Sequence, residues 1–432
     1  MRVLHVIQRY WPYTGGAERH LAEISERLAG EGHSVMLYTT DALDLELFWN
    51  PAKRRIPVAR EDHRGVAIHR FPVRHWPLPR WSFGGIRRLM AQVSALPVDT
   101  TPLLRTMATL APRVPDFERA LARLEGPLDV VHGMNICFES LLYPAWRAAR
   151  RLGAAFVVTP LTHLGEVDDD HVRRYYTMRH QLALLAQSDA VLVQTDIERQ
   201  YLAAHGVPVD RMVRAGVGVN PGDLLGGDGE RFRRKYGIAG PIVFYLGTAA
   251  YDKGTHHLVQ AMCRLWEGGL EGALVLAGPS LDQFATFLAA QPAPVRQRVH
   301  VLGVIPEADK RDLLDAGAVM AMPSRTDSLG IVYLEAWLYA KPVIGALAGG
   351  VPEVIGDGVD GFLVRFGDVE AIADRLARLL GDADLARRLG EAGRRKVWQR
   401  YTWDGIYPVV REAYAEVCRR RRTREAPVEQ LS

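Results

Sequence analysis

Two carboxylates around the start of one predicted helix are the residues best placed to do chemistry. A predicted apolar strand ends at Met322, Asp327 lies in the following loop, the helix begins at Leu329–Gly330, and Glu335 lies within its first two turns. The first N–H groups of a helix carry about +0.5 of a charge, so this position favours an anion or a polar ligand. The alternative to a ligand site is that Asp327 caps the helix and Glu335 is a solvated helix residue. The helix is otherwise nearly apolar, however, and a carboxylate there needs a polar partner.

Two adjacent glycines, Gly15 and Gly16, precede the first predicted helix. Glycines let the backbone approach a ligand closely and present N–H groups to a phosphate or an acceptor, although a simple turn explains them equally well. The 14 histidines, three cysteines and the acids form no cluster with metal-ligand spacing, and no acid pair at glycoside-hydrolase geometry can be read from spacing. We therefore expect a ligand held by backbone N–H groups and single charges, without a metal.

Short apolar strands alternate with helical segments along most of the chain, which predicts parallel sheets wound with helices on both faces. A Gly-, Pro- and Asp-rich stretch at 221–229 interrupts the alternation and predicts a linker between two such domains. Ligands of these folds bind at the carboxyl ends of the strands, so we expect a cleft there. The domains that we expect are 1–220, carrying an insertion at 43–125, and 230–400, followed by a helix at 401–418 and a disordered basic tail at 419–432.

The insertion concentrates the positive charge of the chain. Residues 51–90 hold ten Lys and Arg against two acids, whereas the whole protein has a net charge of only +4. Because the charge is local, a nucleic-acid-binding protein is not indicated. Within 70–90 arginines alternate with aromatic residues, which suits an arm for an anionic or lipid-linked acceptor. The alternative is that the aromatic residues pack onto their own domain. The side chains that we assign to the acceptor from this arm are Arg74, Trp76, Arg80 and Trp81.

The composition is that of an ordinary globular protein, with 48% hydrophobic and 24% charged residues, which excludes a disordered or collagen-like chain. There is no apolar run of 18 residues, and the opening MRVLHVIQRYW is too short in its apolar part for a signal peptide. We expect a cytoplasmic protein with peripheral contact at the inner membrane face. The three cysteines are too widely spaced for a disulfide framework.

Several motifs together resemble family 4 of the retaining glycosyltransferases, which have the GT-B fold of two facing Rossmann-like domains. The resemblance extends over nearly the whole chain, and it implies that the final helix crosses back onto the N-terminal domain. Asp327 stands where the family usually has Glu. The motifs that carry the resemblance are Pro323-Ser324, Asp327, Glu335-Ala336, Pro342-Val343 and Gly349-Gly350-Val351-Pro352-Glu353.

The resemblance also implies roles for single residues. His163, Asp327 and Lys253 are the implied catalytic residues: His163 beside the donor sugar, Asp327 on that sugar, and Lys253 on the diphosphate. Thr248 occupies the position where the family usually has a second cation, an arginine. His132, at a strand end, joins the acceptor set. The implied donor-binding residues are Gly16, Gly247, Thr248, Lys253, Gly278, Val304, Asp327, Leu329, Gly330 and Glu335.

The activity implied by the resemblance is transfer of a hexosyl unit from a nucleotide diphosphate sugar, with UDP favoured weakly over GDP-mannose, and without a cofactor. Anomeric configuration would be retained, and the acceptor would be a glycan, a lipid-linked sugar or a small molecule. Two alternatives remain open on the same fold, a sugar-nucleotide epimerase and a nucleotide-sugar-binding module without catalysis. A membrane-surface scaffold would rest on the basic segments alone.

Overall fold

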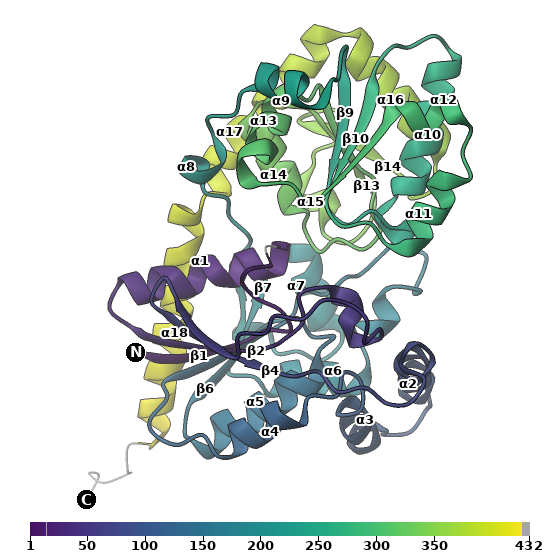
Figure 1. The fold of residues 1–432 in the computed structure, drawn as a ribbon. Helices are drawn as coiled ribbons and strands as arrows, with labels where there is room; N and C mark the ends of the chain where they lie inside the picture. The colour runs from purple at the N-terminus through teal and green to yellow at the C-terminus, as the bar shows by residue number, and fades with distance from the viewer. Residues whose placement is uncertain (14, 426–432) are drawn as a thin grey trace, which may run out of the picture. The chain divides into compact units, whose positions relative to one another are not determined.

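The chain divides into two compact α/β units in a computed structural model that describes residues 1–13 and 15–425 (Figure 1). The first unit comprises Met1–Thr162, Arg173–Gly216 and the chain from Tyr407 on. The second comprises His163–Val172 and Val217–Ile406. Each unit is built on one sheet that is wholly or mainly parallel, as the alternation of strands and helices predicts.

The sheet of the first unit has the order β3-β4-β2-β1-β5-β6-β7-β8, and only the β3–β4 pair is antiparallel. Side chains of β1 alternate between the faces: His5 contacts Ser25 of α1, whereas Leu4 and Val6 pack in the core that contains α5. The strands are β1 (Arg2–Val6), β2 (Ser34–Thr40), β3 (Arg60–His63), β4 (Val66–Phe71), β5 (Val130–Met134), β6 (Ala155–Thr159), β7 (Ala190–Val193) and β8 (Met212–Arg214). The helices are α1 (Gly16–Gly30), α2 (Pro79–Ser94), α3 (Thr101–Ala108), α4 (Pro115–Ala122), α5 (Glu139–Arg151), α6 (Arg179–Gln187), α7 (Asp196–Ala204) and most of α18 (Trp403–Glu425), with 3-10 turns η1 (Leu45–Phe48), η2 (Arg173–Tyr175) and η3 (Val209–Arg211).

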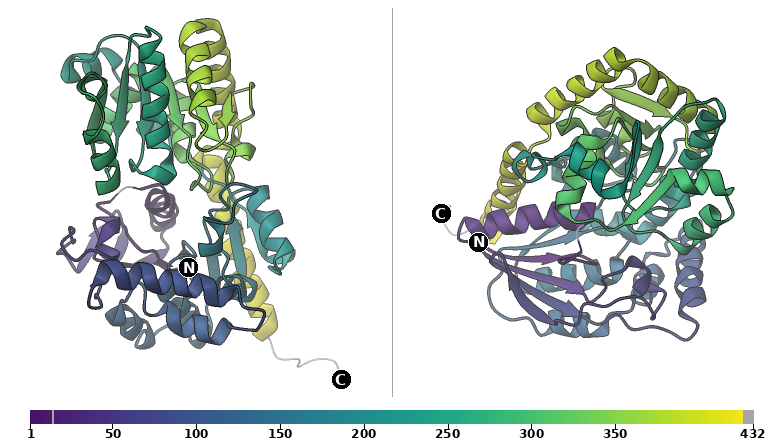
Figure 2. Two further views of the ribbon diagram at one scale, coloured as in Figure 1. Left: turned by 90° about the vertical axis from the view of Figure 1, so that its right-hand side faces the viewer. Right: turned by 45° about the horizontal axis from the view of Figure 1, so that its top comes forward.

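The second unit has six parallel strands in the order β11-β10-β9-β12-β13-β14. Helices α10 and α16 pack together on one face, and α14 and α17 on the other (Figures 1 and 2). Because both faces are covered, central strands such as IVFYL and ALVLA are apolar at every position. The strands are β9 (Ile242–Leu246), β10 (Ala273–Ala277), β11 (Val299–Gly303), β12 (Val319–Met322), β13 (Val343–Ala346) and β14 (Gly361–Val364). The helices are α8 (Pro221–Leu224), α9 (Gly229–Tyr236), α10 (Thr255–Glu267), α11 (Asp282–Ala289), α12 (Ala293–Arg298), α13 (Glu307–Ala316), α14 (Ile331–Leu338), α15 (Val351–Val354), α16 (Val369–Gly381) and α17 (Ala383–Arg400), with the 3-10 turn η4 (Tyr251–Lys253).

The segment 43–125 differs from the insertion that the sequence predicts. Its β3–β4 hairpin extends the sheet of the first unit, with β4 paired in parallel to β2. The charged sequence of β3, REDH, lies at the sheet edge and is not buried, which hid this strand from a search for apolar runs. Helices α2, α3 and α4 and the turn η1 belong to the same segment and lie outside the sheet.

Two further boundaries differ from the prediction. The expected linker 221–229 contains α8 and the first residue of α9. The expected disordered tail begins too early, because α18 continues through residues 419–425; residues 426–432 lie outside the described part of the chain. Helix α18 begins in the second unit and belongs to the first unit from Tyr407 on, where Val410, Tyr414 and Val417 are buried. Among the described helices, none is both long and apolar enough to cross a membrane.

Candidate active site in the second unit

Two glycines bring separate loops against the loop that follows β12. Gly254 has φ +76°, and a Cβ atom there would lie 2.2 Å from the carbonyl oxygen of Pro323. Gly349 has φ +56°, and its Cβ would lie 2.2 Å from the carbonyl oxygen of Asp327. Only glycine fits positions with both this conformation and this proximity. The Lys253-Gly254 and Gly349-Gly350 motifs therefore converge on Asp327.

Lys253 and Asp327 form an ion pair in this loop cluster. The Lys253 Nζ atom lies 3.1 Å from Asp327 Oδ2 and donates a second hydrogen bond of 3.1 Å to the carbonyl oxygen of Thr326. Burial raises the pKa of Asp327, but the charge of Lys253 opposes it, and the net effect lowers that pKa below its ordinary value. Asp327 is therefore an ionised hydrogen-bond acceptor at neutral pH.

His163 lies close enough to this pair to respond to both charges, although it follows β6 of the first unit by only four residues. The loop His163–Val172 belongs to the second unit, where the Gly349 N–H donates to the Gly165 carbonyl at 2.8 Å. Burial, followed by repulsion from Lys253, lowers the pKa of His163 to about 3. The imidazole is therefore neutral at physiological pH, which suits a hydrogen-bonding role and makes it a weak base.

Glu335 lies on α14 and is only 2% exposed. Its Oε1 atom accepts a hydrogen bond of 2.6 Å from Lys310 Nζ, a residue of α13. Lys310 is the polar partner that the apolar sequence of this helix requires. Gly330, with φ +87°, precedes α14, and Leu329 is buried directly before it.

The turn after β9 is held by close backbone contacts. A Cβ atom on Gly278 would lie 2.1 Å from the Gly247 carbonyl oxygen, so the ends of β9 and β10 touch here. The Tyr245 hydroxyl donates to the Thr248 carbonyl at 2.8 Å, and the raised pKa of Tyr245 follows from burial and the nearby Asp327. Tyr245 therefore connects the Thr248 turn to the surroundings of Asp327, and the Thr248 side chain brings no charge.

Arg325 is a second cation at the same edge of the sheet. Its guanidinium donates to Asp252 Oδ1 at 2.7 and 2.9 Å and lies 4.5 Å from the ring centre of Phe366. The Glu166 Oε2 atom lies 3.9 Å from Arg325 Nη1, and the Asp169 Oδ2 atom lies 3.8 Å from it. Arg325 therefore links the His163 loop to the Lys253 turn.

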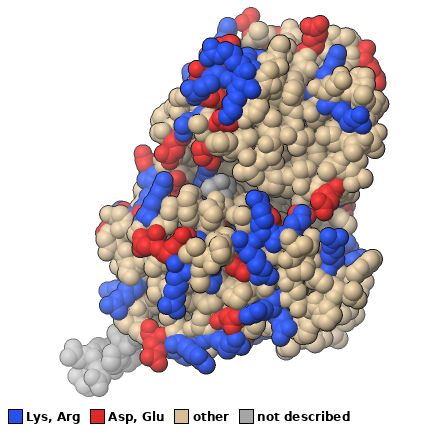
Figure 3. Space-filling view, in the orientation of Figure 1, with Lys and Arg blue, Asp and Glu red and all other residues tan. Residues whose placement is uncertain are grey.

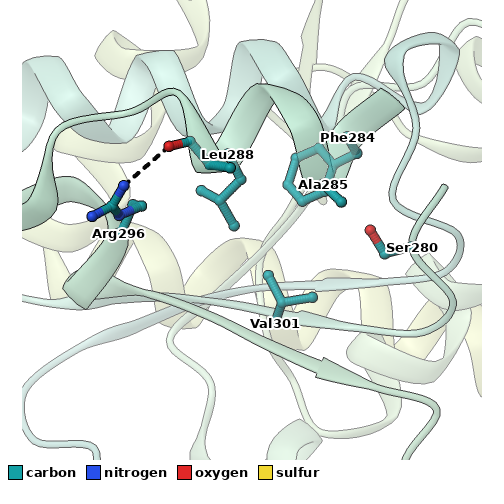
Figure 4. A pocket seen from close by; sticks show the side chains of 7 residues that line it. Ser280, Phe284, Ala285, Leu288, Arg296 and Val301 are labelled. Atoms are coloured by element: carbon teal, nitrogen blue, oxygen red, sulfur yellow. Dashed lines mark hydrogen bonds between the residues drawn. The ribbon is translucent and has the colours of Figure 1, made fainter. Parts of the chain in front are cut away.

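An apolar pocket of about 390 Å³ opens beside the end of β10, between α11 and the edge strand β11 (Figure 4). Phe284 and Leu288 of α11 face Val301 of β11 across it, and Ser280 lies at one end. Its lining includes neither Gly278 nor Val304, and Val304 is exposed on the loop after β11.

The structure corrects the role expected for His132. This side chain is fully buried in the first unit: Nε2 lies 2.8 Å from the Thr159 hydroxyl and Nδ1 lies 2.6 Å from the Tyr414 hydroxyl. The same hydroxyl lies 3.2 Å from His5 Nε2. With both ring nitrogens used inside the protein, His132 anchors the crossing helix α18 and is not available to an acceptor.

The arginine and aromatic segment 70–90 is only partly exposed. Arg87 is buried and donates two hydrogen bonds, of 2.7 and 3.0 Å, to the carboxylate of Glu139, so it is not part of a mobile arm. Arg74 lies 3.5 Å from Asp116, and the Trp76 indole donates to the Leu110 carbonyl at 3.1 Å. The remaining predicted acceptor residues, Arg80 and Trp81, are exposed on α2, and Gly16 lies at the start of α1.

Sequence reasoning missed four side chains around the second-unit site: Tyr245, Lys310, Arg325 and Tyr333. Tyr333 donates to the Met322 carbonyl at 2.6 Å, and its raised pKa follows from burial and then from Asp327. Tyr245 lies two residues before Gly247 and Tyr333 two residues before Glu335, so both could have been found beside residues that the sequence singled out. No sequence signal marks Lys310. Over the described part of the chain, no group of three or more His, Cys, Asp or Glu has a metal-binding arrangement.

Two family models match the chain side by side. Residues 15–218 match the glycosyl transferase 4-like domain, and residues 228–396 match the glycosyl transferases group 1 model. Together the two matches include most of both units.

Sequence relatives agree with these models. The chain is 35% identical over 187 residues to alpha-maltose-1-phosphate synthase of Mycolicibacterium smegmatis, and 33% over 258 residues to D-inositol 3-phosphate glycosyltransferase of Xylanimonas cellulosilytica. These matches include 41% and 56% of this chain, and they span only 48% and 60% of the relatives' own length. A longer match, at 25% identity, includes 94% of this chain and 88% of D-inositol 3-phosphate glycosyltransferase of Stackebrandtia nassauensis.

Solved structures share the fold at low sequence identity. Sucrose-phosphate synthase of Thermosynechococcus elongatus superposes with a TM-score of 0.72 at 20% identity, with 96% of this chain and 98% of that chain included. HepE of Anabaena, solved with UDP-glucose, has a TM-score of 0.71 at 19% identity, with 96% and 100% included. These comparisons confirm the GT-B fold that the sequence predicts. Because the two family models together match most of the chain, we conclude that this chain belongs to family 4 of the glycosyltransferases.

Proposed function

We propose that the protein is a retaining glycosyltransferase that moves a hexosyl unit from a nucleotide diphosphate sugar to an acceptor. The observation that carries the proposal is the convergence of Lys253, Asp327 and His163 just before the N-terminus of α14. The site offers a cation and helix N–H groups for a diphosphate, and a carboxylate and a neutral imidazole for sugar hydroxyls.

The donor would bind with its diphosphate at Lys253 and at the N–H groups around Gly330. The Lys253–Asp327 pair then acts as a bridge, because one ammonium group can contact the phosphate and the carboxylate together. Asp327 would accept hydrogen bonds from the transferred sugar, and Glu335, oriented by Lys310, would accept from the ribose hydroxyls. We favour a UDP-sugar over GDP-mannose as the donor.

The reaction would proceed on one face of the sugar. The bond between the anomeric carbon and the phosphate oxygen breaks, a bond to the acceptor oxygen forms on the same face, and the acceptor proton passes to the departing phosphate. Lys253 would stabilise the charge that develops on the phosphate. His163, whose pKa of about 3 makes it a poor base, would orient the sugar by hydrogen bonding.

For the acceptor we propose only a chemical class, which is a glycan, a lipid-linked sugar or a small molecule. The names of the relatives mention acceptors as different as D-inositol 3-phosphate and L-malate, so they favour no single one. Arg80 and Trp81 are the exposed residues of the predicted acceptor set.

The test is release of nucleoside diphosphate from a panel of nucleotide sugars, with and without an acceptor extract. Wild type should release the nucleotide faster with acceptor, and Asp327→Asn, which keeps the size of the side chain, should lose that increase. Nuclear magnetic resonance of the product should show the anomeric configuration of the donor; inversion would refute the retaining mechanism. Binding without release from any donor would favour the non-catalytic module, for which Thr248 in place of a cation is the supporting observation.

A further inference from the structure

One face of α2 exposes large apolar side chains together with arginines. Leu78, directly before the helix, is 73% exposed, Trp81 is 75% exposed and Leu89 is 51% exposed. Arg80 and Arg88 are exposed beside them. We call these five residues the α2 face. Trp81 and Arg88 are seven residues apart, so they lie on the same side of α2 two turns apart, and Leu89 follows directly after Arg88.

The opposite side of α2 is anchored to the first unit. Arg87 donates two hydrogen bonds to the buried carboxylate of Glu139, and its second terminal nitrogen donates to the Tyr175 carbonyl at 3.2 Å. Met90 is fully buried in a small core with Leu104 and Met178. Because these contacts hold the inner side of the helix in the protein, the α2 face is presented outward as a rigid surface.

The stretch of chain that carries this face contains basic residues and no acidic ones. No Asp or Glu occurs between His63 and Val98, a stretch that contains six arginines. In Figure 3, blue and tan side chains predominate at the lower right, where α2 and α3 lie in Figure 1. A symmetric dimer through the α2 face would bring the arginines of both copies into one interface without an acidic residue of this face to pair with them, which is unfavourable. The face is instead complementary to a surface that is both anionic and apolar.

We propose that the α2 face docks the protein on a membrane that contains anionic lipid. Trp81 would lie at the boundary between head groups and acyl chains, where indole rings are favoured. Leu78 and Leu89 would enter the acyl region, and Arg80 and Arg88 would contact the anionic head groups. Docking of this kind is peripheral and reversible, and it is independent of the donor chemistry proposed above.

The test is co-sedimentation of the full chain with vesicles of phosphatidylcholine alone, or with 30% phosphatidylglycerol, at low and high salt. We expect binding only to the anionic vesicles, and weaker binding in high salt. In Arg80→Gln/Arg88→Gln, the loss of about 1 kcal/mol for each charge lowers the partition coefficient about 30-fold. Trp81→Ser/Leu89→Ser should also lose binding. Trp398→Ser removes another half-exposed tryptophan, 54% exposed on α17, and should bind like wild type.

Four results would overturn the proposal. The first is that the wild type does not sediment with anionic vesicles at low salt. The second is that it binds neutral and anionic vesicles equally. The third is that the α2 variants bind anionic vesicles as well as Trp398→Ser does, although their unchanged unfolding temperature shows that they are folded. Sedimentation of the wild type as a dimer that the α2 variants abolish would instead assign the face to a second copy.

Discussion

Replacing Lys253 with methionine removes the positive charge at the centre of the proposed site while keeping much of the aliphatic side chain. In the wild type, the Lys253 Nζ atom lies 3.1 Å from Asp327 Oδ2. At that distance the direct attraction is about 5 kcal/mol with an effective dielectric of 20, most of which is offset by desolvation of the two groups. The side chains of Lys253 and Asp327 remain 26% and 18% exposed, so we expect the unfolding free energy to fall by about 2 kcal/mol.

The pH dependence of this loss follows from Asp327. In the wild type its folded-state pKa lies below the unfolded value of about 3.9, so its stabilising contribution is present above that pH and is lost as the pH falls through the folded pKa. In the variant, burial is no longer opposed by Lys253, and the pKa of Asp327 should rise above its unfolded value. The ionised carboxylate then destabilises the variant at neutral pH. The difference between the two proteins should narrow on acidification.

The assay is thermal unfolding of both proteins at pH 7.5 and pH 4.5. For a unit of about 200 residues, 2 kcal/mol lowers the unfolding temperature by about 4–8 °C, and we expect this difference at pH 7.5 and a smaller one at pH 4.5. Lys235→Met is the matched control, because Lys235 forms a similarly short pair of 2.6 Å with Asp309 but is half-exposed. A Lys253→Met difference that is equal at both pH values, or no larger than that of the control, would refute the reasoning.

Four further predictions follow from the same contacts. Lys253→Ala should weaken binding of UDP at least ten-fold and binding of uridine little, as measured by calorimetry; equal losses would remove Lys253 from the phosphate. Glu335→Gln should abolish transfer. Lys310→Met removes the hydrogen bond of 2.6 Å to the Glu335 carboxylate, so steady-state kinetics should show KM for the donor raised more than kcat is lowered. Tyr414→Phe removes the hydroxyl that joins His132 and His5 and should cost about 1–3 kcal/mol in urea unfolding; no loss would contradict the anchoring role. EDTA should leave the transfer rate unchanged, and inhibition that a divalent ion reverses would contradict the metal-free proposal.

The sequence predicts the fold well, because strands buried on both faces are apolar throughout and the intervening helices keep their own period. Asp327 and Lys253 could be placed together only through the resemblance, since the contact depends on Gly254 packing against Pro323. The acceptor-binding role predicted for His132 is wrong because the partner of its ring, Tyr414, lies 282 residues away on α18. The contact between Lys310 and Glu335 likewise depends on how α13 packs near α14, and no local sequence pattern indicates it.

Arg87 shows the same limit on the acceptor side. Its neighbours Arg80 and Arg88 are exposed, and the sequence around all three is equally basic and aromatic. Its burial is decided by Glu139, 52 residues later, at the start of α5. Composition therefore located the basic segment correctly, and only the structure separated the anchoring arginine from the exposed ones.

The most direct test of the central claim is calorimetric titration of UDP- and GDP-sugars into the folded wild-type protein and into Glu335→Gln and Lys253→Met. We predict saturable binding of one nucleotide sugar by the wild type at a single site, with an affinity at least ten-fold lower in each variant. Absence of binding for the whole panel by a protein with a normal unfolding transition, or equal binding by all three proteins, would contradict a donor site at Lys253, Asp327 and Glu335.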